Sequence, residues 1–370
     1  MNMPSHYQND LFTELSKYYD EFEVIYAHTH DDARKSLGWN FENAHNFNSK
    51  TIGRDLTIWK IIPYLFKNRK STHIVNGIWA ESIFFFVIIL LNLFQINFLI
   101  YSEASNPFKN RSFLKKIILR FVSVSIAKLL IIKAKGVLAI SIFASNYFKD
   151  LGINDRRIYR FGYFQKEKIH LKLTTKKSCI SLLFVGQLIE RKGIFTLLEA
   201  IEKLFEKYQS FHLSIIGSGI LKDNIQHFIK TQNLQNEVEL LGVIDSQNVS
   251  NYIAQADLLV LPSVFDGWGI VVNEALQNGI SVLISDQCGA KELIREGKNG
   301  FIFKANNVND ITEKLTNFIE LSPHEKLEMM KEIRKMNQNI DIQIVTKYLV
   351  ACVAHSLNQI SIKPTAPWLK

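Results

Sequence analysis

Cysteine is scarce in this chain of 370 residues, which contains only three. Cys179, Cys288 and Cys352 lie far apart and form no C-x-x-C pair, which argues against a disulfide framework and against a zinc site. We expect them to be reduced, buried side chains of a cytosolic protein. An apolar leader is also missing, because the first twenty residues are polar and include acids, so no signal peptide is predicted.

Acidic residues are absent from 104–149, a stretch with nine lysines and arginines. Its charge equals the formal net charge of +9 for the whole chain, so the remainder is balanced. A nucleic-acid binder would spread cations and stacking aromatics over one face, so no nucleic acid is predicted as a partner. Within this stretch, 107–136 mixes eight basic residues with apolar ones at helical spacing. It is typical of an amphipathic surface for anionic lipid, or of a core helix with a solvated basic face.

Charge is missing altogether from 83–101, which is long enough to nominate a transmembrane helix. Asn92, Gln95 and Asn97 interrupt its second half, where a spanning helix would leave amides unsatisfied. The sequence instead predicts a helix of about eleven residues, a turn at 95–97 and a buried strand.

Apolar runs alternate with amphipathic stretches along most of the chain, which is typical of parallel sheets flanked by helices. The expected strands are 22–27, 73–78, 97–103 and 136–141 in the first half, and 180–187, 211–219, 238–243, 257–263, 281–286 and 300–304 in the second. The length allows two domains, and hydrophobic residues make up 47% of the chain, enough for sizeable cores. The predicted division is a first domain over 1–165, a linker over 166–178, a second domain over 179–345, and a helical segment over 346–370 that packs back toward the first domain.

The segment FDGWGIVVNEALQNG, 265–279, places Asp266 and Glu274 eight residues apart around a glycine-bearing turn. The turn lies between a predicted strand and a predicted helix that ends at Gly279. A helix start offers unpaired N–H groups to an anion, and glycines let the backbone approach it closely. Carboxylates accept hydrogen bonds from sugar hydroxyls. The combination favours a nucleotide joined to a sugar, although a tight turn whose acids only cap the helix has the same local chemistry.

This segment resembles the D/E-x7-E signature of retaining glycosyltransferases of family 4. The resemblance extends through GISVLISDQCGAKELIREGKNGFIF (279–303) and LLFVGQLIERKGIFTLLEAI (182–201), with 213–219 and 238–263 in the expected order between them. It implies an α/β chain of GT-B architecture, with two doubly wound Rossmann-like domains facing a central cleft.

The resemblance also implies roles for individual residues in the second domain. Glu274 would accept hydrogen bonds from ribose hydroxyls, and Asp266 would touch the transferred sugar, although relatives usually carry Glu there. Lys192 matches the family's diphosphate lysine, and Arg191 would replace the arginine that relatives carry at Gln187. The further donor-binding candidates are Gly186, Gln187, Gly217, Gly219, Val243, Gly267, Trp268, Gly269, Ile270 and Val271.

Candidates on the acceptor side belong to the first domain. Glu103 follows a predicted strand at the position of a polar active-site residue in relatives, and His6 and Gln8 lie in the first turn of the chain. The segment HTHDD, 28–32, superficially resembles a metal site, but it is a single polar loop without a second cluster of ligands. We therefore expect no metal and no required cofactor, and a nucleotide sugar as co-substrate.

The expected function is retaining transfer of a hexosyl sugar, with a UDP-sugar favoured as donor. The acceptor would be a saccharide or a lipid-linked saccharide in the assembly of bacterial polysaccharide, lipopolysaccharide or capsule. The expected location is cytoplasmic, or peripheral on the inner face of the plasma membrane. Alternatives are a nucleotide-sugar 2-epimerase of the same fold and a basic nucleic-acid-binding protein. The family's first strand, with its glycine turn, has no counterpart at the start of this chain, so that either the true start lies upstream or the fold tolerates the loss.

Overall fold

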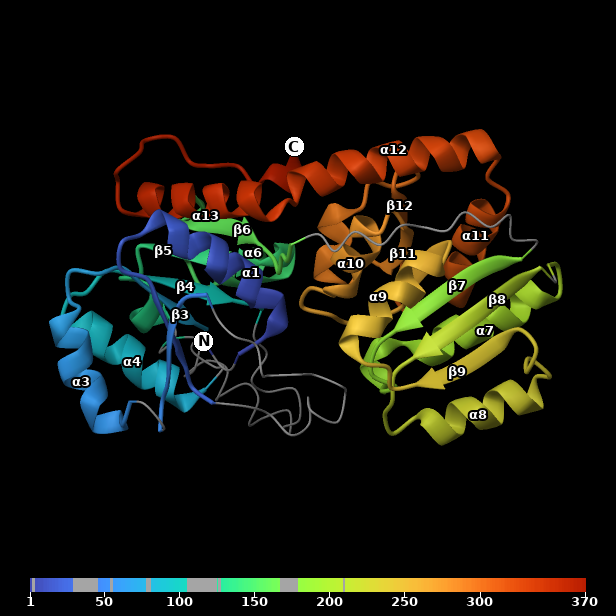
Figure 1. Ribbon diagram of the computed structural model, residues 1–370, viewed down its shortest axis with the longest axis horizontal. Coiled ribbons are helices and arrows are strands. Elements are labelled where there is room, and N and C mark those ends of the chain that lie inside the picture. Colours follow the sequence, from blue (N-terminus) through green and yellow to red (C-terminus); the bar gives the residue numbers. More distant parts are fainter. Residues whose placement is uncertain are drawn as a thin grey trace. The chain divides into compact units, whose positions relative to one another are not determined.

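A computed structural model gives the conformation of most of the chain (Figure 1). The residues it describes are 1, 4–28, 46–53, 56–77, 81–104, 125, 128–166, 179–208 and 210–370. Contacts divide them into two units: the first comprises the described residues up to Phe164 together with Ile342–Lys370, and the second is Gln165–Asp341. Most of the predicted linker and of the basic segment, and four of the five residues of HTHDD, lie outside the described residues.

The second unit is built on a six-stranded parallel sheet in the order β12-β11-β10-β7-β8-β9 (Figure 1). Its strands are β7 (Ile180–Val185), β8 (Phe211–Ile216), β9 (Val238–Gly242), β10 (Leu258–Leu261), β11 (Ser281–Ser285) and β12 (Gly300–Phe303). Every residue of β10 and β11 is buried, which explains why their sequences are continuous apolar runs rather than alternating ones. The predicted strands of this half are confirmed.

Helices connect these strands, as parallel pairing requires. The connecting α-helices are α7 (Ile194–Phe205), α8 (Lys222–Thr231), α9 (Ser246–Gln255) and α10 (Val271–Gln277), and two further helices, α11 (Val308–Ile319) and α12 (Pro323–Asn339), follow β12. The helix α7 buries Ile194, Leu197, Leu198 and Ile201, at spacings of three and four, and it packs against α11. Full burial of each such side chain stabilises the unit by about 1.5–3 kcal/mol.

The first unit holds a four-stranded parallel sheet in the order β3-β4-β5-β6 and a separate parallel pair of β1 and β2. The strands are β1 (Glu23–Tyr26), β2 (Asn48–Thr51), β3 (His73–Asn76), β4 (Phe98–Ser102), β5 (Gly136–Ile140) and β6 (Ile158–Phe161). The helices are α1 (His6–Leu15), α3 (Ile58–Lys67), α4 (Ser82–Leu93), α6 (Ser141–Asp150) and α13 (Ile342–Ser356). The helix α13 packs against α1 within this unit.

The uncharged run folds as predicted. It forms α4, a turn in which Gln95 takes a left-handed backbone conformation (φ 55°), and the buried strand β4. Asn92 is partly buried, and its side-chain amide donates to the carbonyl of Leu130 at 3.0 Å. None of the helices in the described ranges is both long and apolar enough to cross a bilayer.

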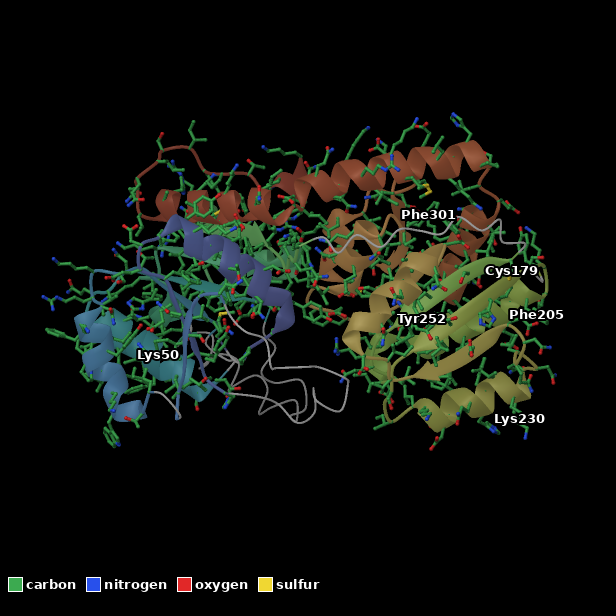
Figure 2. The ribbon with its side chains drawn as sticks, in the orientation of Figure 1. Lys50, Cys179, Phe205, Lys230, Tyr252 and Phe301 are labelled. Carbon is green, nitrogen blue, oxygen red and sulfur yellow. The ribbon has the colours of Figure 1, made fainter. Side chains whose placement is uncertain are left out.

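Two strands of the first unit were not predicted. The strand β2, with the sequence NSKT, has no apolar residue, and its partner side chains stabilise it instead. Lys50 of β2, labelled in Figure 2, forms an ion pair with Glu23 of β1 at 2.6 Å. Its ammonium also lies over the ring of Tyr64. The strand β6, with the sequence IYRF, follows two arginines, and only its pairing with β5 identifies it.

Candidate functional site

The sheet of the second unit reverses its strand order between β7 and β10. Strands β8 and β9 continue the sheet on one side, and β11 and β12 continue it on the other. Ligands of open parallel sheets bind beyond the carboxyl ends of the strands at such a switch point. The chain after β7 leads to Arg191 and Lys192, and the chain after β10 leads to Asp266. The sheet topology therefore brings together two segments that the sequence singled out.

Backbone packing joins these two segments. Gly193 has φ 66°, and a Cβ added there would lie 2.0 Å from the carbonyl oxygen of Pro262, so only glycine fits this position. The N–H of Val264 donates to the carbonyl of Arg191 at 2.9 Å. The Arg191 guanidinium also donates to the carbonyl of Phe265 at 2.9 Å. Arg191, predicted as a second phosphate charge, thus holds the segment that bears Asp266.

Lys192 and Asp266 form an ion pair in which Nζ lies 2.5 Å from Oδ2. Each side chain is only 14% exposed, so water screens the pair less than it would at the surface. Both residues were predicted for the site, but their direct contact was not. An ammonium has three N–H donors, so Lys192 can keep Asp266 and still donate to an anion.

Cys288 lies beside this ion pair, next to Asp266. Its backbone forms an isolated parallel bridge with Asp266, and its side chain is fully buried. Burial, and then the charge of Asp266, raise the pKa of the Cys288 thiol to about 12, while Lys192 acts in the opposite direction. The thiol is therefore protonated at neutral pH and is not a nucleophile there.

The glycine-bearing turn is followed by α10, which begins at Val271. Gly269 has φ 94°. Among the described residues, no backbone carbonyl accepts from the N–H groups of Gly267, Gly269, Ile270 or Val271. The side chain of Trp268 is not available to a ligand of this turn, because it is 1% exposed. Its indole N–H donates to the side chain of Asn273 at 2.9 Å.

Glu274, the second acid, lies in the first turn of α10. Its Oε1 accepts from the side-chain amide of Gln165 at 3.3 Å. The carbonyl of Gln165 in turn accepts from the side chain of Gln277 at 3.0 Å. Gln165 is thus a neighbour of the predicted ribose ligand, and no feature of the sequence pointed to it.

The turn after β8 lies against the turn after β7. A Cβ at Gly217 would stand 1.9 Å from the carbonyl oxygen of Gly186, and one at Gly219 would stand 2.3 Å from that of Leu188. These glycines, predicted to approach a donor, therefore permit contact between backbones. Gln187 is partly exposed beside them, and Val243, just after β9, is 45% exposed.

In the first unit, the predicted acceptor residues lie near the carboxyl end of β4. Glu103 accepts a hydrogen bond from the hydroxyl of Tyr163 at 2.8 Å. Burial raises the pKa of Tyr101; a hydrogen bond with Gln8 lowers it, and the charge of Glu103 raises it. Gln8 and Glu103 are thus both close to Tyr101. His6 begins α1, but its side chain lies outside the described residues.

The metal prediction concerns HTHDD, of which only His28 is described. Its imidazole lies 3.4 Å from Glu81. The described ranges contain no group of three or more His, Cys, Asp or Glu side chains placed to hold a metal ion.

The second unit matches a known protein family. Residues 165–336 match the family model described as glycosyl transferases group 1. These residues form a group 1 glycosyltransferase domain. The resemblance in the sequence is confirmed at this level, and the narrower assignment to family 4 stays a prediction.

Relatives of the group 1 domain include curated proteins. The putative colanic acid biosynthesis glycosyltransferase WcaL of Escherichia coli K12 is 26% identical over 46% of this chain and 44% of its own length. A Campylobacter jejuni protein named N-acetylgalactosamine-N,N'-diacetylbacillosaminyl-diphospho-undecaprenol 4-alpha-N-acetylgalactosaminyltransferase is 31% identical over 38% of this chain and 37% of its own. The chain thus spans less than half the length of either relative.

Solved structures resemble more of the chain. HepE of Anabaena, solved in complex with UDP, covers 97% of this chain and 100% of its own, with a TM-score of 0.72 and 15% identity. At that identity the likeness establishes the fold, and the predicted α/β, GT-B architecture is confirmed.

Proposed function

We propose that this chain is a retaining glycosyltransferase that moves a hexosyl sugar from a nucleotide sugar to a saccharide or lipid-linked acceptor. The observation that carries the proposal is the Lys192–Asp266 pair, which lies at the switch point of a group 1 glycosyltransferase domain. In this proposal the nucleotide sugar is a substrate, and no further cofactor takes part.

The donor would bind along the turns described above. The ammonium of Lys192 would donate to the diphosphate, assisted by the N–H groups of the turn that precedes α10. Asp266 would accept from hydroxyls of the transferred sugar, and Glu274 from those of the ribose. A UDP-sugar is favoured because HepE has been solved with UDP and with UDP-glucose.

The chemistry requires stabilisation of the leaving diphosphate. The bond between the anomeric carbon and the phosphate oxygen breaks, and the acceptor hydroxyl forms its new bond on the same face of the sugar. The hydroxyl proton passes to the departing phosphate oxygen, so no side chain needs to act as a strong base. Lys192 would neutralise negative charge as it develops on that oxygen. Retention of configuration follows if both bonds involve the same face.

The acceptor would bind beside Glu103 in the first unit. The contact with Tyr163 fixes the Glu103 carboxylate, whose second oxygen can accept from a sugar hydroxyl. Gln8, near Tyr101, would add an amide, and His6 remains a candidate on the same helix. The names of the curated relatives favour polysaccharide or lipid-linked saccharide assembly as the setting, on the inner face of the plasma membrane. The basic segment 107–136 would then meet anionic lipid.

The test begins with thermal unfolding in the presence of a panel of UDP-, GDP-, TDP- and ADP-sugars, because a ligand of the folded state raises Tm. The donor that stabilises the protein is then incubated with and without saccharide acceptors, and NMR coupling constants report the anomeric configuration of the product. A new α-glycoside from an α-linked donor supports the proposal. A new nucleotide sugar formed without any acceptor would instead identify an epimerase, and an inverted product would remove the retaining mechanism.

A further inference from the structure

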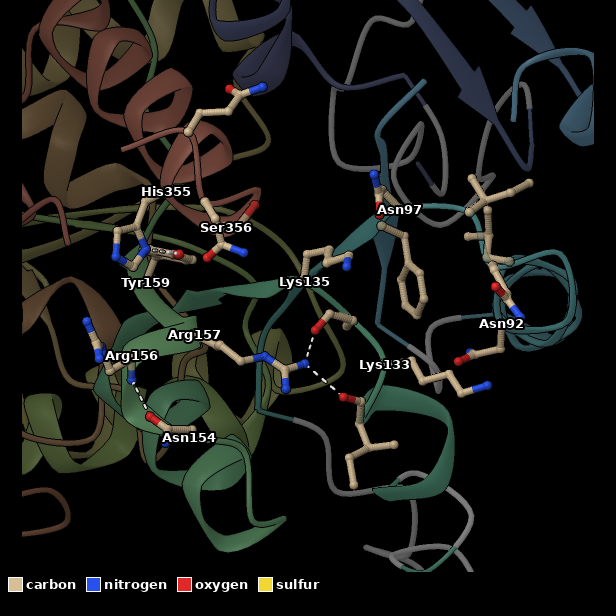
Figure 3. A pocket seen from close by; sticks show the side chains of 18 of the residues that line it. Asn92, Asn97, Lys133, Lys135, Asn154, Arg156, Arg157, Tyr159, His355 and Ser356 are labelled. Atoms are coloured by element: carbon tan, nitrogen blue, oxygen red, sulfur yellow. Dashed lines mark hydrogen bonds between the residues drawn. The ribbon is translucent and has the colours of Figure 1, made fainter. Parts of the chain in front are cut away.

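A polar groove lies in the first unit, at the edge of the sheet where the strands begin (Figure 3). Strands β4, β5 and β6 are parallel, so the residues just before them share one edge. Asn97, Lys135 and Arg157 come directly before these three strands and line the groove. Glu103 follows β4 at the opposite edge, and a strand of five residues spans about 16 Å. The groove is therefore separate from the proposed acceptor side.

The groove is large and carries one sign of charge. Its volume is about 1330 Å³. The lining side chains come from the end of α4, the starts of the three strands, β6, and the end of α13 with the chain that follows it (Figure 3). They include the four cations Lys133, Lys135, Arg156 and Arg157, and no carboxylate.

The nearest acid in the sequence does not neutralise these cations. Asp155 directs Oδ1 to Lys149 at 2.6 Å and Oδ2 to Lys363 at 3.3 Å, and neither lysine lines the groove. Hydrogen bonding to Lys149, and then to Lys363, lowers the pKa of Asp155. Within the described residues, Lys133 and Lys135 have no carboxylate within ion-pair distance. Their charge is therefore uncompensated, and an anion would gain from it.

One cation is already fixed in position. A single guanidinium nitrogen of Arg157 donates to the carbonyls of Ile132, at 2.9 Å, and Ala134. Burial lowers the pKa of Arg157, which still remains charged at neutral pH. Its other nitrogens retain donors for a ligand, and little side-chain entropy is left to lose on binding.

Amides and a hydroxyl–imidazole pair complete the wall. The described structure contains no hydrogen bond from the side chains of Gln95, Asn97 or Gln359, which line the groove. The hydroxyl of Tyr159 lies 2.6 Å from Nδ1 of His355. Ammonium, guanidinium and amide donors together suit the several acceptor oxygens of a phosphate group.

We propose that this groove is a binding site for phosphate groups, supplied by an anionic lipid headgroup or by a soluble phosphate compound. The inference does not depend on the proposed transfer reaction, but its lipid source shares Lys133 and Lys135 with the basic segment 107–136 of the proposed function. The two sources would differ in their contact with apolar side chains of the groove. Ile132 and Ile360 both line it and are 53% and 41% exposed. A lipid would cover these side chains with its chains, and a soluble phosphate would leave them in water.

The first experiment titrates inorganic pyrophosphate into the full-length protein labelled with ¹⁵N on asparagine and glutamine, at low ionic strength. Saturable shifts of the side-chain amide signals of Asn97, Gln95 and Gln359 are expected. These signals should still move in Lys192→Ala, whose donor site would be impaired, so groove binding and donor binding are distinguishable. Shifts confined to residues near Lys192 count against binding of soluble phosphate in the groove.

The double variant Lys133→Gln/Lys135→Gln tests the role of charge. Its matched control is Lys222→Gln/Lys230→Gln on α8, which removes the same charge from exposed lysines of the other unit (Lys230 is labelled in Figure 2). The groove variant should weaken pyrophosphate binding by about tenfold or more, because two charge-assisted contacts are lost, and the control by less than about twofold. Equal weakening in both would overturn a specific site.

Flotation with vesicles of phosphatidylglycerol, and with vesicles of phosphatidylcholine alone, tests the lipid source. Flotation only with phosphatidylglycerol, lost in the groove variant but kept in the control, assigns the site to a headgroup. Groove shifts with pyrophosphate but no flotation assign it to a soluble phosphate. If pyrophosphate shifts no groove signal and the groove variant floats as the control does, the proposal is wrong.

Discussion

The ammonium of Lys192 lies 2.5 Å from the carboxylate of Asp266, across two turns that are 74 residues apart in the sequence. In the proposed function, this pair joins the ligand of the diphosphate, Lys192, to the ligand of the transferred sugar, Asp266. Each residue therefore sets the orientation of the other before any ligand arrives. Preorganisation of this kind reduces the entropy lost when a ligand binds.

Replacement of the two partners should have different effects. Lys192→Ala should slow transfer by several hundredfold or more, or about 3–4 kcal/mol of transition-state stabilisation, because the leaving diphosphate loses its cation. Asp266→Asn should not weaken UDP binding by more than about threefold, because it removes a negative charge near the phosphates. It should still lower turnover. Steady-state kinetics and UDP titration measure both. Unchanged turnover in Lys192→Ala, with the fold intact by circular dichroism, would remove the phosphate role.

Glu274 should affect nucleosides but not bare phosphates. Glu274→Gln is expected to weaken UDP binding by about tenfold, because an amide replaces a charged acceptor of ribose hydroxyls. Inorganic pyrophosphate has no ribose, so its affinity at the same site should not change. Competition titrations with both ligands make the comparison, with Glu239→Gln as a matched control at an exposed carboxylate of the same unit. Equal losses for both ligands would contradict a ribose contact.

Gly193 should be intolerant of any side chain. Gly193→Ala combines a left-handed backbone with a Cβ 2.0 Å from the carbonyl oxygen of Pro262. Gly242→Ala is a matched control, since Gly242 has φ 73° and no atom within 4 Å of an added Cβ. The control should lose about 1–2 kcal/mol of unfolding free energy from the backbone alone, and Gly193→Ala clearly more. Denaturant unfolding measures both, and equal losses would show that the two turns do not pack as described.

The Cys288 thiol should make stability depend on alkaline pH. Its folded pKa of about 12 lies above the ordinary value of 9.0, so its contribution is complete below pH 9 and is lost as pH rises toward 12. The difference in unfolding free energy between the wild type and Cys288→Ala should shrink by about 1.4 kcal/mol per pH unit above pH 9. Unfolding curves between pH 7.5 and 11 measure this difference. A difference that does not vary with pH would place the thiol in water.

Sequence patterns predicted the strands that are buried and apolar, such as β10 and β11, because burial on both faces imposes a recognisable composition. They missed β2, whose four residues are all polar or charged and which is held by side-chain pairing across to β1. The pattern around α4 was decisive for a different reason. Three amides in the second half of the uncharged run argued against a membrane span and located the turn before β4.

Motif resemblance singled out Lys192, Asp266 and Glu274 but could not show that Lys192 and Asp266 form an ion pair. Their contacts depend on the order of β7 and β10 in the sheet, which no local pattern encodes. Gln165 contacts Glu274 only through the fold, because the two residues are 109 positions apart in the sequence. The phosphate groove required four separate segments to meet at one sheet edge, and no local pattern encodes that meeting.

Isothermal titration calorimetry with nucleotide sugars tests the central claim most directly. We predict saturable binding of at least one UDP-, GDP-, TDP- or ADP-sugar to the wild-type protein, weakened about tenfold or more in Lys192→Ala. The absence of heat with every donor, or equal affinity in the variant, would contradict a donor site at Lys192 and Asp266.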